Sequence, residues 1–233
     1  MEKVLYLLNA GEGTSGDGLR ELLVDDVAQR LLASGAHQVQ VNVMDSGVDA
    51  ATGSRLRSGT GSCPDAMVSL WVDSANAPLR AAYDEVLREV DADLVAYLVT
   101  ESAPLPGDPV EGRRPGYTQV SFLQRPERLD EQAWMDHWHH HHTQVAIDTQ
   151  ATNRYIQNLV VRPLTPGAPP CTAVVEETFP VEAMTDQSVF FDAVGDDERR
   201  KANADALMRS VMAFLDFDLI DVVPTSEYTV PRT

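Results

Sequence analysis

Five of the six histidines in this 233-residue chain lie within residues 137–142, next to two of its three tryptophans. An imidazole titrates near neutral pH, so such a cluster can supply a general acid or base. A helix has about 3.6 residues per turn, which brings Trp134, Trp138 and His142 onto one side and turns His140 away. The pattern therefore predicts one inward-facing histidine, His142, beside a wall of two indole rings.

General acid/base catalysis is the chemistry that this arrangement favours. Burial disfavours the charged imidazole, so a neutral base at His142 is available at physiological pH. Tyr155 is the candidate donor that polarises or orients a carbonyl, and Trp134 and Trp138 are suited to hold a planar ligand. One base and one donor suffice for dehydration, decarboxylation or ring closure, so no cofactor is expected.

Polar residues on two later strands are further candidates for substrate binding, namely Gln157, Asn158 and Glu176. Side chains alternate along a strand, so Gln157 shares a face with Tyr155, whereas Asn158 lies on the other face. These residues therefore cannot all line one pocket. For Glu176 and its neighbour Glu177, an exposed position on the strand is the simpler interpretation.

Structural roles compete with these assignments. The two tryptophans also fit ordinary packing of a helix on a sheet, and His142 also fits a buried histidine bonded to a backbone carbonyl. His139, His140 and His141 are expected to form a solvated face.

No metal or nucleotide site is expected. His137 and His141 are one helical turn apart and suit a shared ion, but no second ligand motif accompanies them. The glycine-rich residues 11–16 lack the lysine and hydroxyl residue that close a phosphate-binding loop.

The elements that carry these residues fall into two similar series. Strands are predicted at residues 4–8, 39–43, 67–72 and 94–99, with helices after Gly16 and at residues 78–90. The second series has strands at 117–123, 154–161, 172–179 and 218–223, the last extending toward 230. Its helices are expected at 130–147 and, less regularly, within 182–215. Each series has the order βαββαβ.

A segment rich in proline, glycine and charge separates the two series. We therefore predict a first unit at residues 1–106, a linker at 107–116 and a second unit at 117–233. The sequences of residues 97–102 and 222–227 end the two units alike, which suggests an internal duplication. Each unit would form a four-stranded antiparallel sheet with helices on one face, and pairing the two sheets would cover the other.

The second unit resembles the EthD-like family of the dimeric α+β barrel superfamily. Trp134, His137, Trp138 and His142 match the helix pattern of that family, and residues 154–158 and 175–179 are similar to two of its strands. The resemblance implies that two ferredoxin-like units close a pseudo-dimeric barrel. It also implies a small, often aromatic or polyketide-like ligand between sheet and helices, in a family that includes lyases, cyclases and cofactor-free oxygenases.

The first unit departs from this pattern. Its corresponding helix presents Leu19, Leu23 and Val27 where the second presents tryptophans and a histidine. We therefore expect this unit to be a scaffold, which leaves one pocket per chain.

Composition limits the partners and the compartment. The chain has 36 acidic and 18 basic residues and a formal charge of -18, which disfavours nucleic acid and anionic membranes. No apolar run has the length of a membrane span. Cys63 and Cys171 lack metal-ligand spacing and fit a reducing compartment, so a cytoplasmic location is predicted. A monomer with pseudo-two-fold symmetry or a homodimer fits the predicted fold.

The leading hypothesis is a cofactor-independent lyase or cyclase that acts on a small aromatic or polyketide-like metabolite through His142 and Tyr155. The first alternative is a non-catalytic auxiliary protein that holds a hydrophobic ligand for a monooxygenase. The second alternative is a cofactor-free oxygenase.

Overall fold

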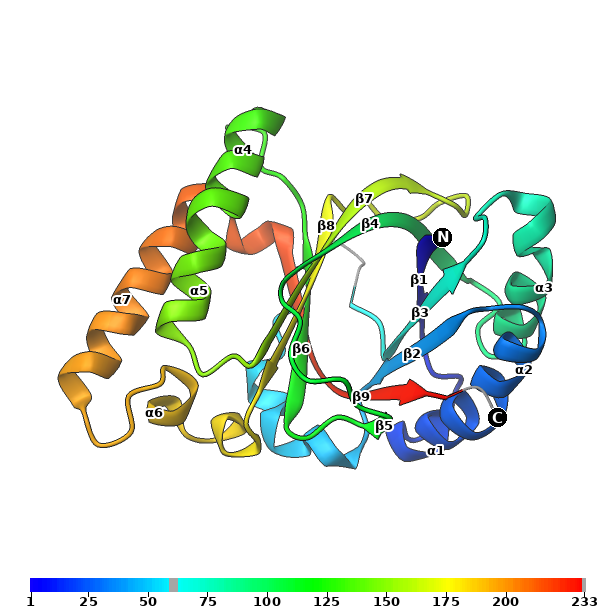
Figure 1. The fold of residues 1–233 in the computed structure, drawn as a ribbon, viewed down its shortest axis with the longest axis horizontal. Coiled ribbons are helices and arrows are strands. Elements are labelled where there is room, and N and C mark those ends of the chain that lie inside the picture. Colours follow the sequence, from blue (N-terminus) through cyan, green and yellow to red (C-terminus); the bar gives the residue numbers. More distant parts are fainter. Residues whose placement is uncertain (59–62, 232–233) are drawn as a thin grey trace.

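The computed structural model describes residues 1–58 and 63–231 and shows strands wrapped into a barrel with helices outside (Figure 1). Residues 59–62, between the predicted strands 39–43 and 67–72, and residues 232–233, at the end of the predicted second unit, lie outside the described residues. The strands are β1 (Glu2–Leu8), β2 (Gln38–Val43), β3 (Ala66–Val72), β4 (Val95–Leu105), β5 (Gly112–Arg113), β6 (Tyr117–Leu123), β7 (Arg154–Pro163), β8 (Ala173–Phe179) and β9 (Ile220–Val230).

Helices of several kinds connect these strands. In the first half they are α1 (Gly16–Glu21), η1 (Leu22–Val27), α2 (Ala28–Ala33), η2 (Ser46–Ser54) and α3 (Ala77–Arg88). In the second half they are α4 (Glu131–His137), η3 (Trp138–His142), α5 (Thr143–Thr149), η4 (Val181–Met184), α6 (Gln187–Phe190), α7 (Asp197–Phe214) and η5 (Phe217–Leu219). The predicted region 182–215 is thus three separate helices, and the last strand does extend to Val230.

The sheet closes on itself. Its strands follow the order β2-β3-β1-β4-β7-β8-β6-β9, and β9 pairs with β2 to complete the circle. All of these pairs are antiparallel. Mixed helix and strand content in a closed antiparallel barrel is therefore confirmed. The two halves have corresponding strand orders, β2-β3-β1-β4 and β7-β8-β6-β9, while their origin by duplication stays a prediction.

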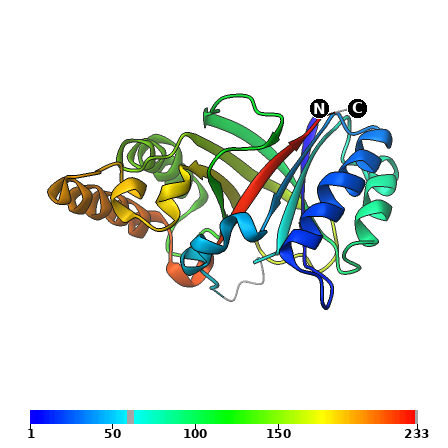
Figure 2. The same cartoon turned by 90° about the horizontal axis from the view of Figure 1, so that it is seen from below.

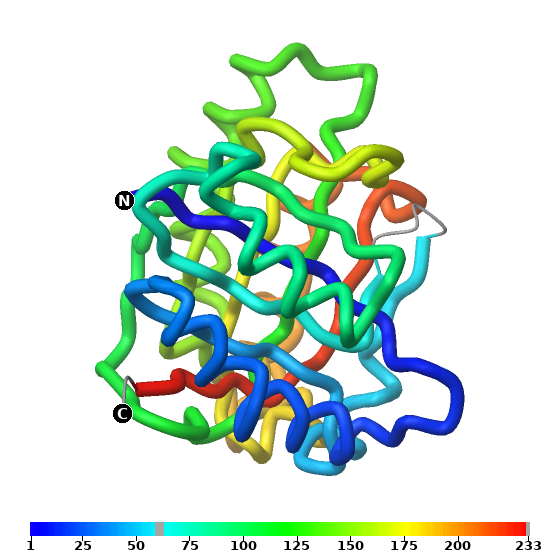
Figure 3. The backbone as a smooth tube through the Cα atoms, turned by 90° about the vertical axis from the view of Figure 1, so that its right-hand side faces the viewer, coloured from blue at the N-terminus to red at the C-terminus, as the bar shows by residue number. Residues whose placement is uncertain are grey.

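Helices cover the barrel on two opposite sides. In Figure 2 the helices α1, α2 and α3 (blue and teal) lie on one side and α4, α5 and α7 on the other, and Figure 3 looks onto α1, α2 and α3. The predicted stripe of Leu19, Leu23 and Val27 is buried against the outer faces of β1, β2 and β3, and forms a dry core. Nowhere in the described part of the chain is a helix long and apolar enough to cross a membrane.

Part of the predicted linker pairs with the sheet of the barrel. Within it, the short strand β5 pairs with β9. Gly116 then leads into β6 with a positive φ of 88°, and a Cβ there would lie 2.0 Å from the carbonyl oxygen of Phe179. Only glycine fits this close approach between two strands.

The histidine helix contains a wide turn that its sequence did not predict. Asp130 caps α4 by accepting a hydrogen bond from the Ala133 amide, and the helix then takes π geometry through η3. The Thr143 amide and hydroxyl both donate to the carbonyl of Trp138, the hydroxyl at 2.8 Å. A π turn contains one residue more than an α-helical turn. Thr143, and not His142, therefore lies one turn after Trp138 on the side that faces the sheet.

Charged side chains fill part of the barrel interior. Glu176 is fully buried and contacts Lys3 Nζ at 3.2 Å and Arg154 Nη1 at 3.3 Å. Arg154 also lies 3.1 Å from Glu227, which is 2% exposed. Burial alone raises the pKa of Glu176, but the charges of Lys3 and Arg154 more than offset this and hold it below its usual range. Of these buried ion pairs, Lys3–Glu176 joins the two halves of the chain.

Replacing Arg154 with Met should destabilise the fold, because two buried carboxylates then lose a shared cation. We expect the free energy of unfolding in urea to fall by about 3 kcal/mol. Protonation relieves the uncompensated charge, so the deficit should be smaller at about pH 5 than at about pH 8.

The matched control is Arg200→Met, which removes an arginine that pairs with the exposed Asp197. Its effect should stay below about 0.5 kcal/mol. Equal effects of the two substitutions would show that the buried network does not stabilise the barrel.

Candidate functional site

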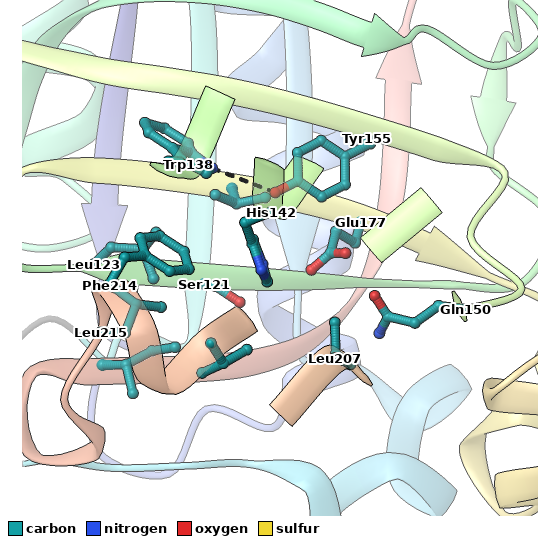
Figure 4. Close-up of a pocket in the computed structure, with 13 residues that line it drawn as sticks. Ser121, Leu123, Trp138, His142, Gln150, Tyr155, Glu177, Leu207, Phe214 and Leu215 are labelled. Atoms are coloured by element: carbon teal, nitrogen blue, oxygen red, sulfur yellow. Dashed lines mark hydrogen bonds between the residues drawn. The ribbon is translucent and has the colours of Figure 1, made fainter. Parts of the chain in front are cut away.

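A pocket lies between the outer face of the second-half sheet and the helices that cover it (Figure 4). Its volume is about 90 Å³. The sheet provides its floor through β6, β7, β8 and β9, whereas η3 and α7 provide its walls. The lining residues are Ser121, Leu123, Trp138, His142, Gln150, Tyr155, Val175, Glu177, Leu207, Val211, Phe214, Leu215 and Ile220.

Trp138 and Tyr155 meet at one wall of this pocket. Both side chains are almost fully buried, and the Trp138 indole N–H donates to the Tyr155 hydroxyl at 3.4 Å. Burial raises the pKa of the Tyr155 hydroxyl, as does the nearby charge of Glu177. Tyr155 therefore keeps its proton at neutral pH and is a hydrogen-bond donor.

His142 reaches the pocket from the π turn. Its Nδ1 lies 3.0 Å from the Ser210 hydroxyl of α7, and its ring packs on Phe214 at 4.6 Å between centroids. Burial lowers the pKa of His142 to about 3, with smaller contributions from His137 and His141. Burial therefore favours the neutral imidazole. A pKa this low also makes it a weak proton acceptor at neutral pH.

Glu177 is the acidic group of the pocket and was not among the predicted site residues. It stands directly opposite Tyr155 in the β7–β8 pairing, on the same face of the sheet. One carboxylate oxygen, Oε1, is enclosed and has no hydrogen-bond partner, while the side chain retains some exposure. Burial raises the pKa of Glu177 to about 7. A carboxyl group with this pKa exchanges a proton readily at neutral pH.

Three predicted binding residues do not line this pocket. Asn158 and Glu176 point into the barrel, where the Asn158 amide donates to Glu176 Oε1 at 3.0 Å. Alternation along β7 and β8 puts them on the opposite face from Tyr155 and Glu177. The expectation of an exposed Glu176 was therefore wrong. Gln157 does face the helices, but its amide donates to the Thr143 hydroxyl at 2.8 Å and links the strand to α5.

The other tryptophan and the other histidines of this helix lie partly in the core and partly at the surface. Trp134 is fully buried and packs on Trp138 with 5.0 Å between ring centroids, behind the pocket wall. His137 stacks on Phe214 of α7, and His140 is exposed. His139 is only partly exposed and packs on Trp138, so the expected solvated face is incomplete.

No group of three or more histidine, cysteine, aspartate or glutamate side chains suited to a metal ion occurs in residues 1–58 and 63–231.

Residues 126–218 match the family model of the EthD domain. The second half of the chain is thus similar to the EthD domain over these residues. The resemblance inferred from its helix and strand motifs is thus confirmed, over a stretch that includes the π turn and Glu177. No curated protein matches the chain.

A crystal structure of an anthrone oxidase-like protein has a similar fold, with a TM-score of 0.56 and 10% sequence identity. The match covers 100% of this chain and 94% of that chain. At this identity the likeness shows the fold alone, and it extends over both halves of the chain.

Glu177→Gln should stabilise the protein at alkaline pH. The carboxyl pKa of about 7 in the folded state lies above its unfolded value. Such a group stabilises the fold below the unfolded pKa and loses that contribution as pH rises through 7. We expect the advantage of the variant in urea unfolding to grow by about 3 kcal/mol between about pH 4 and about pH 8.5.

The control for this measurement is Glu198→Gln, which removes an exposed carboxyl near the start of α7. Its difference from the wild type should not change with pH. A similarly flat difference for Glu177→Gln would contradict the raised pKa.

Proposed function

We propose that this protein binds a small, largely apolar molecule in the pocket under η3 and α7 and transfers a proton on it. The observation that carries the proposal is Glu177, a carboxyl with a pKa of about 7 and an unpartnered oxygen beside the pocket. A buried polar atom without a partner disfavours folding, so its retention supports a functional role. The EthD domain and its small-molecule pocket agree with this role.

The proposal assigns three different tasks to the polar side chains. Glu177 takes the proton from a carbon or hydroxyl of the ligand, because its pKa matches the working pH. Tyr155 stands across from it and donates a hydrogen bond to the oxygen on which charge develops. His142 remains neutral and orients the ligand from the opposite wall. This set supports dehydration, decarboxylation or ring closure, and it moves the task of the base from His142 to Glu177.

Figure 4 shows where the side chains with these proposed roles lie. The carboxylate of Glu177 and the imidazole of His142 approach the same space from the sheet and from the helix. Apolar side chains from α7, including Leu207 and Phe214, border that space. A ligand held there loses most of its water, which strengthens the electrostatic interactions with Glu177 and Tyr155.

Base-catalysed ring opening of 5-nitrobenzisoxazole tests the role of Glu177 without knowledge of the natural substrate. A base removes the C3 proton, the N–O bond breaks, and a cyanophenolate is released. We expect kcat/KM to rise through an apparent pKa near 7, because ionised Glu177 is the reactive form. Glu177→Gln should lower kcat/KM by about 100-fold or more.

Two further variants make this test specific. Glu198→Gln removes an exposed carboxyl and should leave kcat/KM unchanged. His142→Asn should keep the rising pH profile with a smaller loss. If His142→Asn removes the activity and Glu177→Gln does not, His142 is the base. Binding of the probe without any turnover would favour an auxiliary, ligand-holding role.

Cofactor-free oxygenation is the second candidate function. It is favoured by the structural neighbour, which is described as anthrone oxidase-like. Removal of a proton from a carbon acid also begins such a reaction, so the same pocket would serve. We expect oxygen uptake in the presence of anthrone to depend on Glu177, measured with an oxygen electrode. Uptake equal to that of buffer alone would exclude anthrone as a substrate for oxygenation.

A further inference from the structure

A second cavity lies on the same outer face of the sheet as the first pocket. Its volume is about 370 Å³, and η2, η4 and α6 border it. Four of its ten lining residues are aromatic or thioether side chains, namely Tyr117, Met184, Phe190 and Phe191, and four are polar, namely Ser54, Gln119, Thr185 and Gln187. Phe190 stacks on Phe179 at 4.7 Å and meets Phe191 edge-on at 5.0 Å. Such walls suit a flat apolar group.

The two cavities are neighbours along a single strand. Tyr117 and Gln119 of β6 line the second cavity, whereas Ser121 and Leu123 of the same strand line the first. These four residues alternate along β6, so their side chains point to one side of the sheet. The two cavities therefore follow one another along this face of β6, with Gln119 beside one cavity and Ser121 beside the other.

Glu177 stands at the boundary between the cavities. It lines the first pocket and pairs directly with Gln119, which lines the second. Burial raises the pKa of Tyr117, and the charge of Glu177 raises it further, so the two groups interact across this boundary. Gln150, which also lines the first pocket, precedes Ala151, whose amide donates to the Phe190 carbonyl at 2.9 Å.

We propose that the second cavity is the other compartment of one binding site, and this rests on the proposed function of the first pocket. The reacting polar end of the ligand lies beside Glu177, and an apolar ring or chain extends past Gln119 onto Phe190 and Phe191. Alone, the first pocket of about 90 Å³ is smaller than typical small-molecule sites, whereas the two compartments together reach that range.

The lining also defines the charge of the ligand. In the part of the chain that the structure describes, no lysine or arginine lines either cavity. The formal charge of the chain is -18, so anions are repelled. The expected ligand is thus elongated and uncharged, with a hydroxyl or carbonyl on one ring and an apolar group several bonds away.

Calorimetric titration with phenol and 4-benzylphenol tests this arrangement. Phenol fills only the first pocket, whereas the benzyl group of 4-benzylphenol reaches the second compartment. We expect 4-benzylphenol to bind at least about tenfold more tightly than phenol. Gly53→Phe should remove this advantage and leave phenol binding unchanged, because Gly53 lines the second cavity and a Cβ there meets no atom within 4 Å.

Two more variants complete the experiment. Thr52→Phe places the same side chain on an exposed neighbour outside the cavity and should keep the advantage of 4-benzylphenol. Gln187→Trp, from the exposed surface of α6, should remove it from another side of the cavity. An advantage that persists in both Gly53→Phe and Gln187→Trp would overturn the two-compartment site. Failure of the wild type to bind phenol would instead refute the proposed function of the first pocket.

Discussion

Closure of the barrel is the constraint on which the rest of this structure depends. Once β2 pairs with β9 and β4 with β7, the eight strands of the closed barrel each turn one face to its interior and the other face outward. Neighbouring residues then meet different surroundings. Glu176 points inward to Lys3 and Arg154, and its pKa falls. Glu177, one residue later, points outward without a cation, and its pKa rises to about 7. A single step along β8 thus separates the ion-paired carboxylate from the one that we propose as the base.

The π turn adapts the covering helix to that outward face. A regular helix would align His142 with Trp138 over the sheet. The added residue brings Thr143 to the sheet instead, where its hydroxyl accepts from Gln157 and donates to the Trp138 carbonyl. His142 is then free to pack on α7 through Ser210 and Phe214. The His142 imidazole packs on α7, and the space between it and Glu177 belongs to the pocket.

Much of the fold follows from patterns that a sequence displays directly. Alternation along strands places Tyr155 and Asn158 on opposite faces, and the spacing of Trp134 and Trp138 places both indoles in the core. The position of Glu177 was less accessible, because it depends on the register between β7 and β8, which sets Tyr155 opposite it. Register is a property of two paired strands, so neither strand alone reveals it. The π turn was likewise missed, because helical periodicity assumes a constant number of residues per turn.

The two halves use the same outer face in opposite ways. In the first half, β3 presents Val68 and Leu70 to helices that carry leucine and valine, and the space between them is filled. In the second half, β8 presents Val175 and Glu177 to helices that leave a pocket. The filled half also provides Lys3, which pairs with Glu176 within the barrel. Its contribution to the proposed chemistry is therefore indirect: it completes the barrel and pairs the inward carboxylate of β8, while alternation along that strand points Glu177 outward.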